Sequence, residues 1–341
     1  MKPIPLNLMT VYADVLQSLE MGDNDAASIA TKTIKNKRYI YATKKDGSAR
    51  IEKYLGSADD PAVQAEVDRL RHAAERAKNL RSSVTLLKAA RLPAPSLILG
   101  RILEVVANAG LFNRGMTLVG TAAYQTYAPI LGYYLPTATY ATNDVDLSVV
   151  EFVPGENEED FHTLLKRADK SFEPLWSQDD KLPKAFRASN GFIVELLTSF
   201  GRGRKSPVVI EGLNAAAVPL SFQEYPTEET LQAVALYGGG VLVRVPTPAR
   251  FAVHKLIVAQ RRKPTELAKK QKDLRQAQEL IDILLETDES TLQSELDGAR
   301  ERGKSWKTQI NASLREMSRD VRQGRLPIVV ASKTKRGAQL G

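Results

Sequence analysis

Two proline-containing breaks divide this chain of 341 residues and constrain its fold more than any other sequence feature. The first is LPAP at residues 92–95, and the second is VPTP at residues 245–248. Between them, apolar strand-like segments first alternate with helical ones and then predominate, which favours a mixed sheet. After the second break the pattern is almost purely helical, over residues 248–262, 265–286 and roughly 290–320. We therefore predict an α+β fold.

The same breaks predict how the chain is organised. Residues 1–95 are expected to form an N-terminal helix/β-hairpin module, and residues 96–245 a mixed-sheet core. Residues 246–325 are expected to form a helical C-terminal domain. The final residues, 326–341, are predicted to be a loose basic tail.

The first part of the chain contains a candidate β-hairpin with a basic surface. The segment RYIYATKKDGSARIEKYLG, residues 38–56, has alternating tyrosines before a KDGS turn, and Asp60 and Pro61 then begin a helix. Residues 32–54 hold eight Lys and Arg against two Asp and Glu, a local charge of +6. Such a face could hold a nucleic-acid backbone and stack bases, while the alternative is an ordinary solvated hairpin.

The residue inventory limits the chemistry that is available. The chain has no cysteine, which excludes disulfides, thiolate zinc sites and cysteine nucleophiles. Its three histidines, His72, His162 and His254, are far apart in the sequence and do not indicate a metal cluster. Carboxylates, hydroxyls, amines and a hard cation are therefore the expected catalytic groups.

Charge and hydropathy indicate the setting and the partners. The sequence has no apolar run long enough to cross a membrane and no apolar signal core, so we expect a cytoplasmic protein without a membrane partner. The net charge of +8 favours an anionic partner. Residues 300–336 add a second basic segment, with eleven Lys and Arg against three Asp and Glu. Trp306 within it could stack on a base or anchor the core.

The most informative motif is Thr-Asn-Asp-Val-Asp-Leu at residues 142–147. In a strand, residues two apart point to the same face, so Asp144 and Asp146 would present two adjacent carboxylates. Two carboxylates repel each other unless a divalent cation lies between them. Mg²⁺ commonly takes one or two carboxylates and fills its other positions with water and phosphate oxygens. The pair is thus a candidate magnesium site.

Two further segments strengthen this interpretation. Upstream, an apolar strand runs into Gly120 and Thr121 at the start of a helix, where backbone N–H groups attract phosphate. Downstream, Glu195 interrupts the apolar run FIVELL. A charge in such a run is costly unless it is paired or binds a metal. The alternative places Glu195 at a strand end, near solvent or Arg187.

This order of motifs resembles the DNA polymerase β-type nucleotidyltransferase superfamily. The superfamily pattern is a Gly-Ser or Gly-Gly helix start, a metal-binding D-x-D or D-x-E, and a third acid. By this resemblance, Gly120 and Thr121 would bind the nucleotide, and Asp144, Asp146 and Glu195 would be catalytic metal ligands. Thr in place of Ser and Glu in place of the commoner Asp are departures, and the second leaves a structural role for Glu195 open.

A narrower resemblance is to the bacterial branch that contains AbiEii-type nucleotidyltransferase toxins. It rests on T-x-D-V-D-L, on PTPARFAVHKL and on the later Lys-Asp pair. In that branch a helical Lys and a later Asp complete the site, which here implies Lys255 and Asp273 as catalytic residues. Arg262 follows Lys255 on nearly the same helical face, and together they could clamp phosphate or form a solvated basic face.

The resemblance covers roughly residues 97–285 and implies a nucleotidyltransferase-like core. It implies an enzyme that moves an NMP from an NTP to a hydroxyl acceptor with Mg²⁺ or Mn²⁺. RNA, such as a tRNA 3′ end, is the first expected acceptor and a protein side chain the second; an antitoxin is a further possible partner. The alternatives are a non-catalytic nucleic-acid-binding or regulatory protein with this fold, and an aminoglycoside-type small-molecule transferase, which the basic flanks disfavour.

Overall fold

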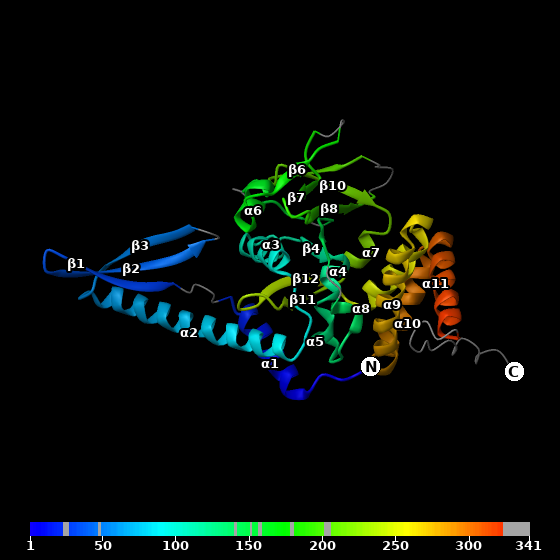
Figure 1. Ribbon diagram of the computed structural model, residues 1–341, viewed down its shortest axis with the longest axis horizontal. Helices are drawn as coiled ribbons and strands as arrows, with labels where there is room; N and C mark the ends of the chain where they lie inside the picture. The colour runs from blue at the N-terminus through cyan, green and yellow to red at the C-terminus, as the bar shows by residue number, and fades with distance from the viewer. Residues whose placement is uncertain are drawn as a thin grey trace.

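The structure, a computed structural model, describes residues 1–22, 27–46, 49–139, 142–150, 152–155, 159–177, 181–200 and 206–322. A compact body contains the central sheet and the C-terminal helices, and an arm projects from one side of it (Figure 1). The predicted basic tail, residues 326–341, lies outside the described residues. No helix in the described part is long and apolar enough to cross a membrane.

The arm is a three-stranded antiparallel sheet packed on one end of a long helix (Figure 1). The predicted hairpin is confirmed as the second and third strands, and a preceding strand extends it. The predicted helix start is also confirmed, since Asp60 accepts a 2.9 Å hydrogen bond from the Ala62 backbone N–H and Pro61 is the first helical residue. The elements of this region are α1 (Leu6–Glu20), β1 (Ser28–Ile34), β2 (Lys37–Asp46), β3 (Ala49–Ser57) and α2 (Pro61–Ala89).

A seven-stranded mixed sheet forms the centre of the body, which confirms the predicted α+β class. Its main path runs β4-β5-β8-β10-β9, and β7 joins β6 to β8. The pairs β5–β8 and β8–β10 are parallel, and the other pairs are antiparallel. The strands are β4 (Thr117–Val119), β5 (Asp144–Ser148), β6 (Glu173–Leu175), β7 (Ala185–Arg187), β8 (Ile193–Ser199), β9 (Val208–Ile210) and β10 (Ala215–Leu220).

Short helices and a separate two-stranded antiparallel sheet surround this sheet. The helix expected to begin at Thr121 is only five residues long, and a second short helix follows it. These elements are α3 (Leu97–Asn108), α4 (Gly120–Tyr124), α5 (Tyr127–Leu131), η1 (Pro136–Thr139), α6 (Phe161–Ala168), α7 (Glu224–Thr227), β11 (Thr230–Ala235) and β12 (Val241–Pro246).

The last described part of the chain is helical, as predicted. The single helix expected over roughly 290–320 is wrong, because Gly303 has a φ of +143°, a conformation that glycine alone adopts readily, and it separates two helices. The elements are α8 (Pro248–Arg261), η2 (Pro264–Glu266), α9 (Leu267–Thr287), α10 (Glu289–Glu301) and α11 (Lys304–Arg322). Trp306 is buried against Phe222 and Tyr225, with ring centroids 4.6 and 5.5 Å away, so it anchors the core.

One buried hydrophobic cluster includes residues from all three predicted structured parts, among them Tyr12 of α1, Leu147 of β5 and Leu280 of α9. The carboxyl-terminal half of α2 belongs to it, whereas the arm has a small cluster of its own built on Ile40 and Val63. The domain boundaries themselves stay a prediction. The continuous helix α2 therefore connects the arm to the body that holds the candidate site.

Candidate functional site

Three carboxylates predicted to act together lie on one face of the central sheet. Asp144 and Asp146 are two residues apart on β5, and Asp146 is the direct partner of Glu195 in the parallel pairing of β5 with β8. Directly paired residues of neighbouring strands share a face, as do residues two apart on one strand. The opposite face is core, where Val145 and Leu196 are buried. Glu195 is the third residue of a seven-residue strand and so does not lie at a strand end, but its side chain is exposed to solvent, as that alternative expected.

The carboxylates perturb one another. Burial, and then the charges of Asp144 and Glu195, raise the pKa of Asp146 to about 7, although Lys255 and Arg262 act in the opposite direction. Burial and the Asp144 charge also raise the pKa of Glu195. Asp144 accepts a 2.5 Å hydrogen bond from the Thr142 hydroxyl, which orients it. The site therefore concentrates negative charge that a cation would stabilise.

Gly120 lies directly against this acidic pair. It has a φ of +66°, and a β-carbon built on it would overlap the Oδ2 atom of Asp146. The register explains the proximity, since Val119, the last residue of β4, pairs with Asp146 in the antiparallel β4–β5 ladder. Gly120 is thus required both for its backbone conformation and for the space its missing side chain leaves.

Lys272 connects this turn to helix α9, and sequence reasoning had missed it. Its Nζ donates a 2.9 Å hydrogen bond to the Thr121 hydroxyl. Burial and the neighbouring Lys255 lower the pKa of the half-buried Lys272, while Asp273 and Asp144 raise it. A sequence signal existed, because Lys272 immediately precedes Asp273 in the Lys-Asp pair that supports the family resemblance.

The predicted residues Lys255, Arg262 and Asp273 are brought together in a buried charge cluster. Asp273, fully buried, accepts hydrogen bonds of 2.6 Å from Lys255 and 2.8 Å from Arg262, one at each carboxylate oxygen. Burial opposes ionisation of Asp273, but the two cations win and lower its pKa. The solvated basic face considered for Lys255 is wrong, since its side chain is buried. Both cations still act on Asp146 electrostatically.

A second buried acid on α9, Glu279, holds α4 and η1 in place. Glu279 accepts a 2.6 Å hydrogen bond from the hydroxyl of Tyr124, the last residue of α4. It also accepts hydrogen bonds from the backbone N–H and the hydroxyl of Thr137 in η1. Neither Glu279 nor Tyr124 was singled out from the sequence, since nothing local distinguishes them. Helix α9 therefore supplies groups that hold α4 as well as groups beside the carboxylates.

The donor set suits a hard cation that binds together with a substrate. Within the described ranges, no group of three or more His, Cys, Asp or Glu side chains is arranged as a formed metal site. Carboxylate oxygens are nevertheless the ligands that Mg²⁺ prefers, and it needs only one or two of them when phosphate and water complete its shell. The pairing that sets Asp146 opposite Glu195, two residues from Asp144 on the same face, is the structural observation that fits such a cation.

Comparison with protein families decides the assignment. A family model described as Nucleotidyltransferase matches residues 98–300, more than half of the chain. The chain belongs to this nucleotidyltransferase family. The match contains every candidate site residue, from Gly120 to Asp273, and excludes the arm. The protein is therefore an NTP-dependent nucleotidyltransferase. No curated protein and no solved structure matches it, and the narrower AbiEii-type branch stays a prediction.

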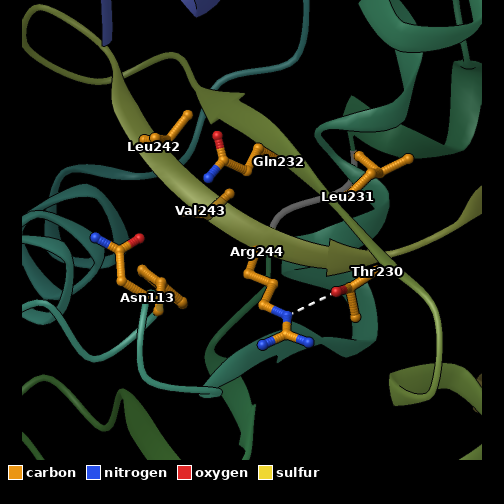
Figure 2. A pocket seen from close by; sticks show the side chains of 8 residues that line it. Asn113, Thr230, Leu231, Gln232, Leu242, Val243 and Arg244 are labelled. Atoms are coloured by element: carbon orange, nitrogen blue, oxygen red, sulfur yellow. Dashed lines mark hydrogen bonds between the residues drawn. The ribbon is translucent and has the colours of Figure 1, made fainter. Parts of the chain in front are cut away.

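A pocket of this nucleotidyltransferase lies away from the carboxylates. It has a volume of about 310 Å³ and is lined by β11, β12 and the loop before β4 (Figure 2). Arg244 is one of the lining residues and donates a 2.6 Å hydrogen bond from Nε to the Thr230 hydroxyl (Figure 2). None of the candidate site residues lines it. The carboxylate face of the sheet, and not this pocket, is therefore the candidate active site.

Proposed function

We propose that this enzyme transfers an NMP from an NTP to a hydroxyl acceptor by a metal-assisted mechanism. The observation that carries the proposal is the paired register of Asp146 with Glu195, beside Asp144 and directly against Gly120. Acids on adjacent strands and a close backbone turn are what a metal-bound triphosphate requires. The mutual pKa shifts of the acids support the same conclusion.

Asp144 and Asp146 would hold the cation, Mg²⁺ or Mn²⁺. Such a cation, when bound, would neutralise the negative charge that develops as pyrophosphate departs. Hydrogen bonding from Thr142 keeps one oxygen of Asp144 oriented, and the turn at Gly120 lies directly against the Oδ2 of Asp146. These two contacts would preorganise the acids before substrate arrives.

Gly120, Thr121 and Lys272 would receive the β- and γ-phosphates. The ammonium group of Lys272 already lies within hydrogen-bond distance of the Thr121 hydroxyl, so both can reach one phosphate oxygen. Helix α4 is too short for its dipole to contribute much, and the Lys272 charge would supply the main attraction. Lys255 and Arg262, held by Asp273, would add positive potential without leaving their ion pairs.

Glu195 would act on the acceptor. Its raised pKa makes it a better proton acceptor than an ordinary glutamate, and it is exposed on the strand next to Asp146. It would take the proton from the attacking hydroxyl as the oxygen approaches the α-phosphate, or bind a second cation. The pyrophosphate leaves on the side of Lys272.

RNA is the proposed acceptor, with a tRNA 3′ end first and a protein side chain second. Two basic segments support the proposal of a polyanionic acceptor. They are residues 32–54 in the arm and residues 300–336, of which residues 323–336 lie outside the described part. An antitoxin partner belongs to the proposal only through the AbiEii-type resemblance. Cation contacts to several phosphates would make acceptor binding steeply dependent on salt.

The test uses purified protein, each α-³²P-labelled NTP, Mg²⁺ and total RNA, with products separated on a gel. Label on RNA from the wild type, absent in Asp146→Asn and retained in Glu211→Gln, would support the proposal; Glu211 is an exposed acid outside the site. Label on protein instead of RNA would support nucleotidyl transfer and show that the acceptor is a protein. No labelled product with any NTP, from protein that still melts cooperatively, would contradict it.

A further inference from the structure

The arm exposes a sheet face that packs against nothing in the described part of the chain. In the three-stranded sheet, Ile40 and Ala42 of β2 point toward α2 and are buried. The alternating residues Tyr39 and Tyr41 therefore point the other way. Figure 1 shows the sheet on one side of α2, well away from the central sheet. The face that carries these tyrosines thus looks into solvent.

Three tyrosines form a continuous surface on this face. The pairing register places Tyr54 of β3 opposite Tyr41 of β2. The Tyr54 ring lies 5.4 Å from that of Tyr41 and 6.0 Å from that of Tyr39, between centroids. Tyr54 is 54% exposed, unusually open for a large aromatic side chain. The rings are tilted against one another, and the exposed Tyr54 lies between the half-buried Tyr39 and Tyr41.

Cations border the tyrosines. Lys32 of β1 lies 4.3 Å from the centroid of the Tyr41 ring and also pairs with Glu52 at 2.7 Å. By the same register, Lys37 and Arg50 lie on this face, and both are exposed. Among the described side chains, this face holds these three cations against one acid, Glu52. Open aromatic rings between cations are the combination that holds single-stranded nucleic acid without reading its sequence.

We propose that the outer face of the arm, defined by Lys32, Lys37, Tyr39, Tyr41, Arg50 and Tyr54, is a stacking platform for single-stranded polynucleotide. Bases stack on the tyrosine rings while the cations contact the backbone phosphates. A duplex does not offer its base faces, so the platform selects unpaired strands. Lys32, Lys37 and Arg50 lie beside the tyrosines, so charge complementarity favours a polyanion, and hence a nucleic acid, as the occupant.

The inference rests on the proposed function for its biological use, because the platform would hold part of the acceptor RNA. Helix α2 has 29 residues, so it is about 43 Å long and holds the platform at a distance from the carboxylates. An acceptor would have to be long enough to touch both. A short acceptor would react at the carboxylates without touching the arm. Binding to the arm can therefore be tested separately from nucleotidyl transfer.

The experiment measures fluorescence anisotropy of a 5′-labelled twelve-nucleotide U-rich RNA with the full chain. Tyr41→Ala/Tyr54→Ala is expected to raise Kd about 10-fold or more, and Tyr41→Phe/Tyr54→Phe to keep wild-type affinity. Trp176→Ala removes a 59% exposed ring outside the arm and is the matched control, with no change expected. Lys37→Ala/Arg50→Ala should reduce the slope of log K against log salt by about 1.4. Thermal melts check that each variant folds.

Each result supports or overturns the platform. Equal binding of the same strand as DNA supports it, because stacking does not need the 2′-hydroxyl. A Kd unchanged by the tyrosine-to-alanine pair, or equal affinity for a duplex, overturns it. A wild type that transfers no nucleotide but binds RNA through the tyrosines would defeat the proposed function alone. A wild type that transfers nucleotides and binds RNA regardless of the tyrosines would defeat the platform alone.

Discussion

Gly120 and Asp146 lie so close together that any side chain at position 120 would collide with the Oδ2 atom of the acid. The contact joins the end of β4 to the D-x-D strand and places the carboxylate directly against the turn. Glycine at this position therefore serves the site twice, by its left-handed backbone and by its lack of volume.

Replacing Gly120 by alanine should damage activity more than stability. The backbone penalty is about 1 kcal/mol, and the displaced Asp146 should reduce kcat/KM for NTP about 10-fold or more. Gly110→Ala is the matched control, since Gly110 has a φ of +72° with nothing near its missing β-carbon. It should lose comparable stability and no activity. Equal activity of the two variants would show that the Asp146 contact is unimportant.

Much of this arrangement could be predicted from local patterns, and the limits have physical causes. The two-residue period of a strand placed Asp144 and Asp146 together, and Pro61 and Asp60 fixed the start of α2. The sequence could not show that Glu195 lies opposite Asp146. The two parallel strands are joined by a long connection, and their pairing register leaves no local sequence signal.

Long-range pairing explains the other gaps as well. The helical spacing brought Lys255 and Arg262 to one side, although Arg262 is the extended residue that follows α8. Nothing in that spacing showed that Asp273 on α9 would bind both. Lys272 and Glu279 were missed for the same reason, as their partners Thr121 and Tyr124 lie more than 150 residues away.

Removing the Lys272 ammonium should weaken binding of the triphosphate. Lys272→Ala is expected to raise KM for NTP about 10-fold with little change in melting temperature, because a charge-assisted phosphate contact is lost. Lys270→Ala provides the comparison, since Lys270 pairs with Glu316 at 2.8 Å and not with Thr121. Steady-state kinetics at several NTP concentrations measure the effect. A wild-type KM for Lys272→Ala would remove this lysine from the phosphate site.

Asp273 should contribute stability that depends on pH. Its folded-state pKa lies below 3.8, the ordinary value, so its contribution is complete above that value and is lost as the pH falls through the folded-state pKa. Asp273→Asn leaves two cations less well paired and should cost about 3 kcal/mol at pH 7. Urea unfolding from pH 7 to pH 3 measures the difference between wild type and variant. We expect it to shrink only below about pH 4; a difference that is constant over this range would contradict the ion-pair account.

Neutralising Asp146 should stabilise the protein when no metal is present. Burial, and then the charges of Asp144 and Glu195, disfavour the ionised form of Asp146, so Asp146→Asn in EDTA at pH 8 is expected to raise the free energy of unfolding by about 2 kcal/mol. Asp68→Asn, at an exposed acid on α2, should change nothing. Added Mg²⁺ or Mn²⁺ should stabilise the wild type and not the Asp146 variant, since a ligand that binds only the folded state shifts the unfolding equilibrium. Equal metal-induced shifts in both proteins would place the cation elsewhere.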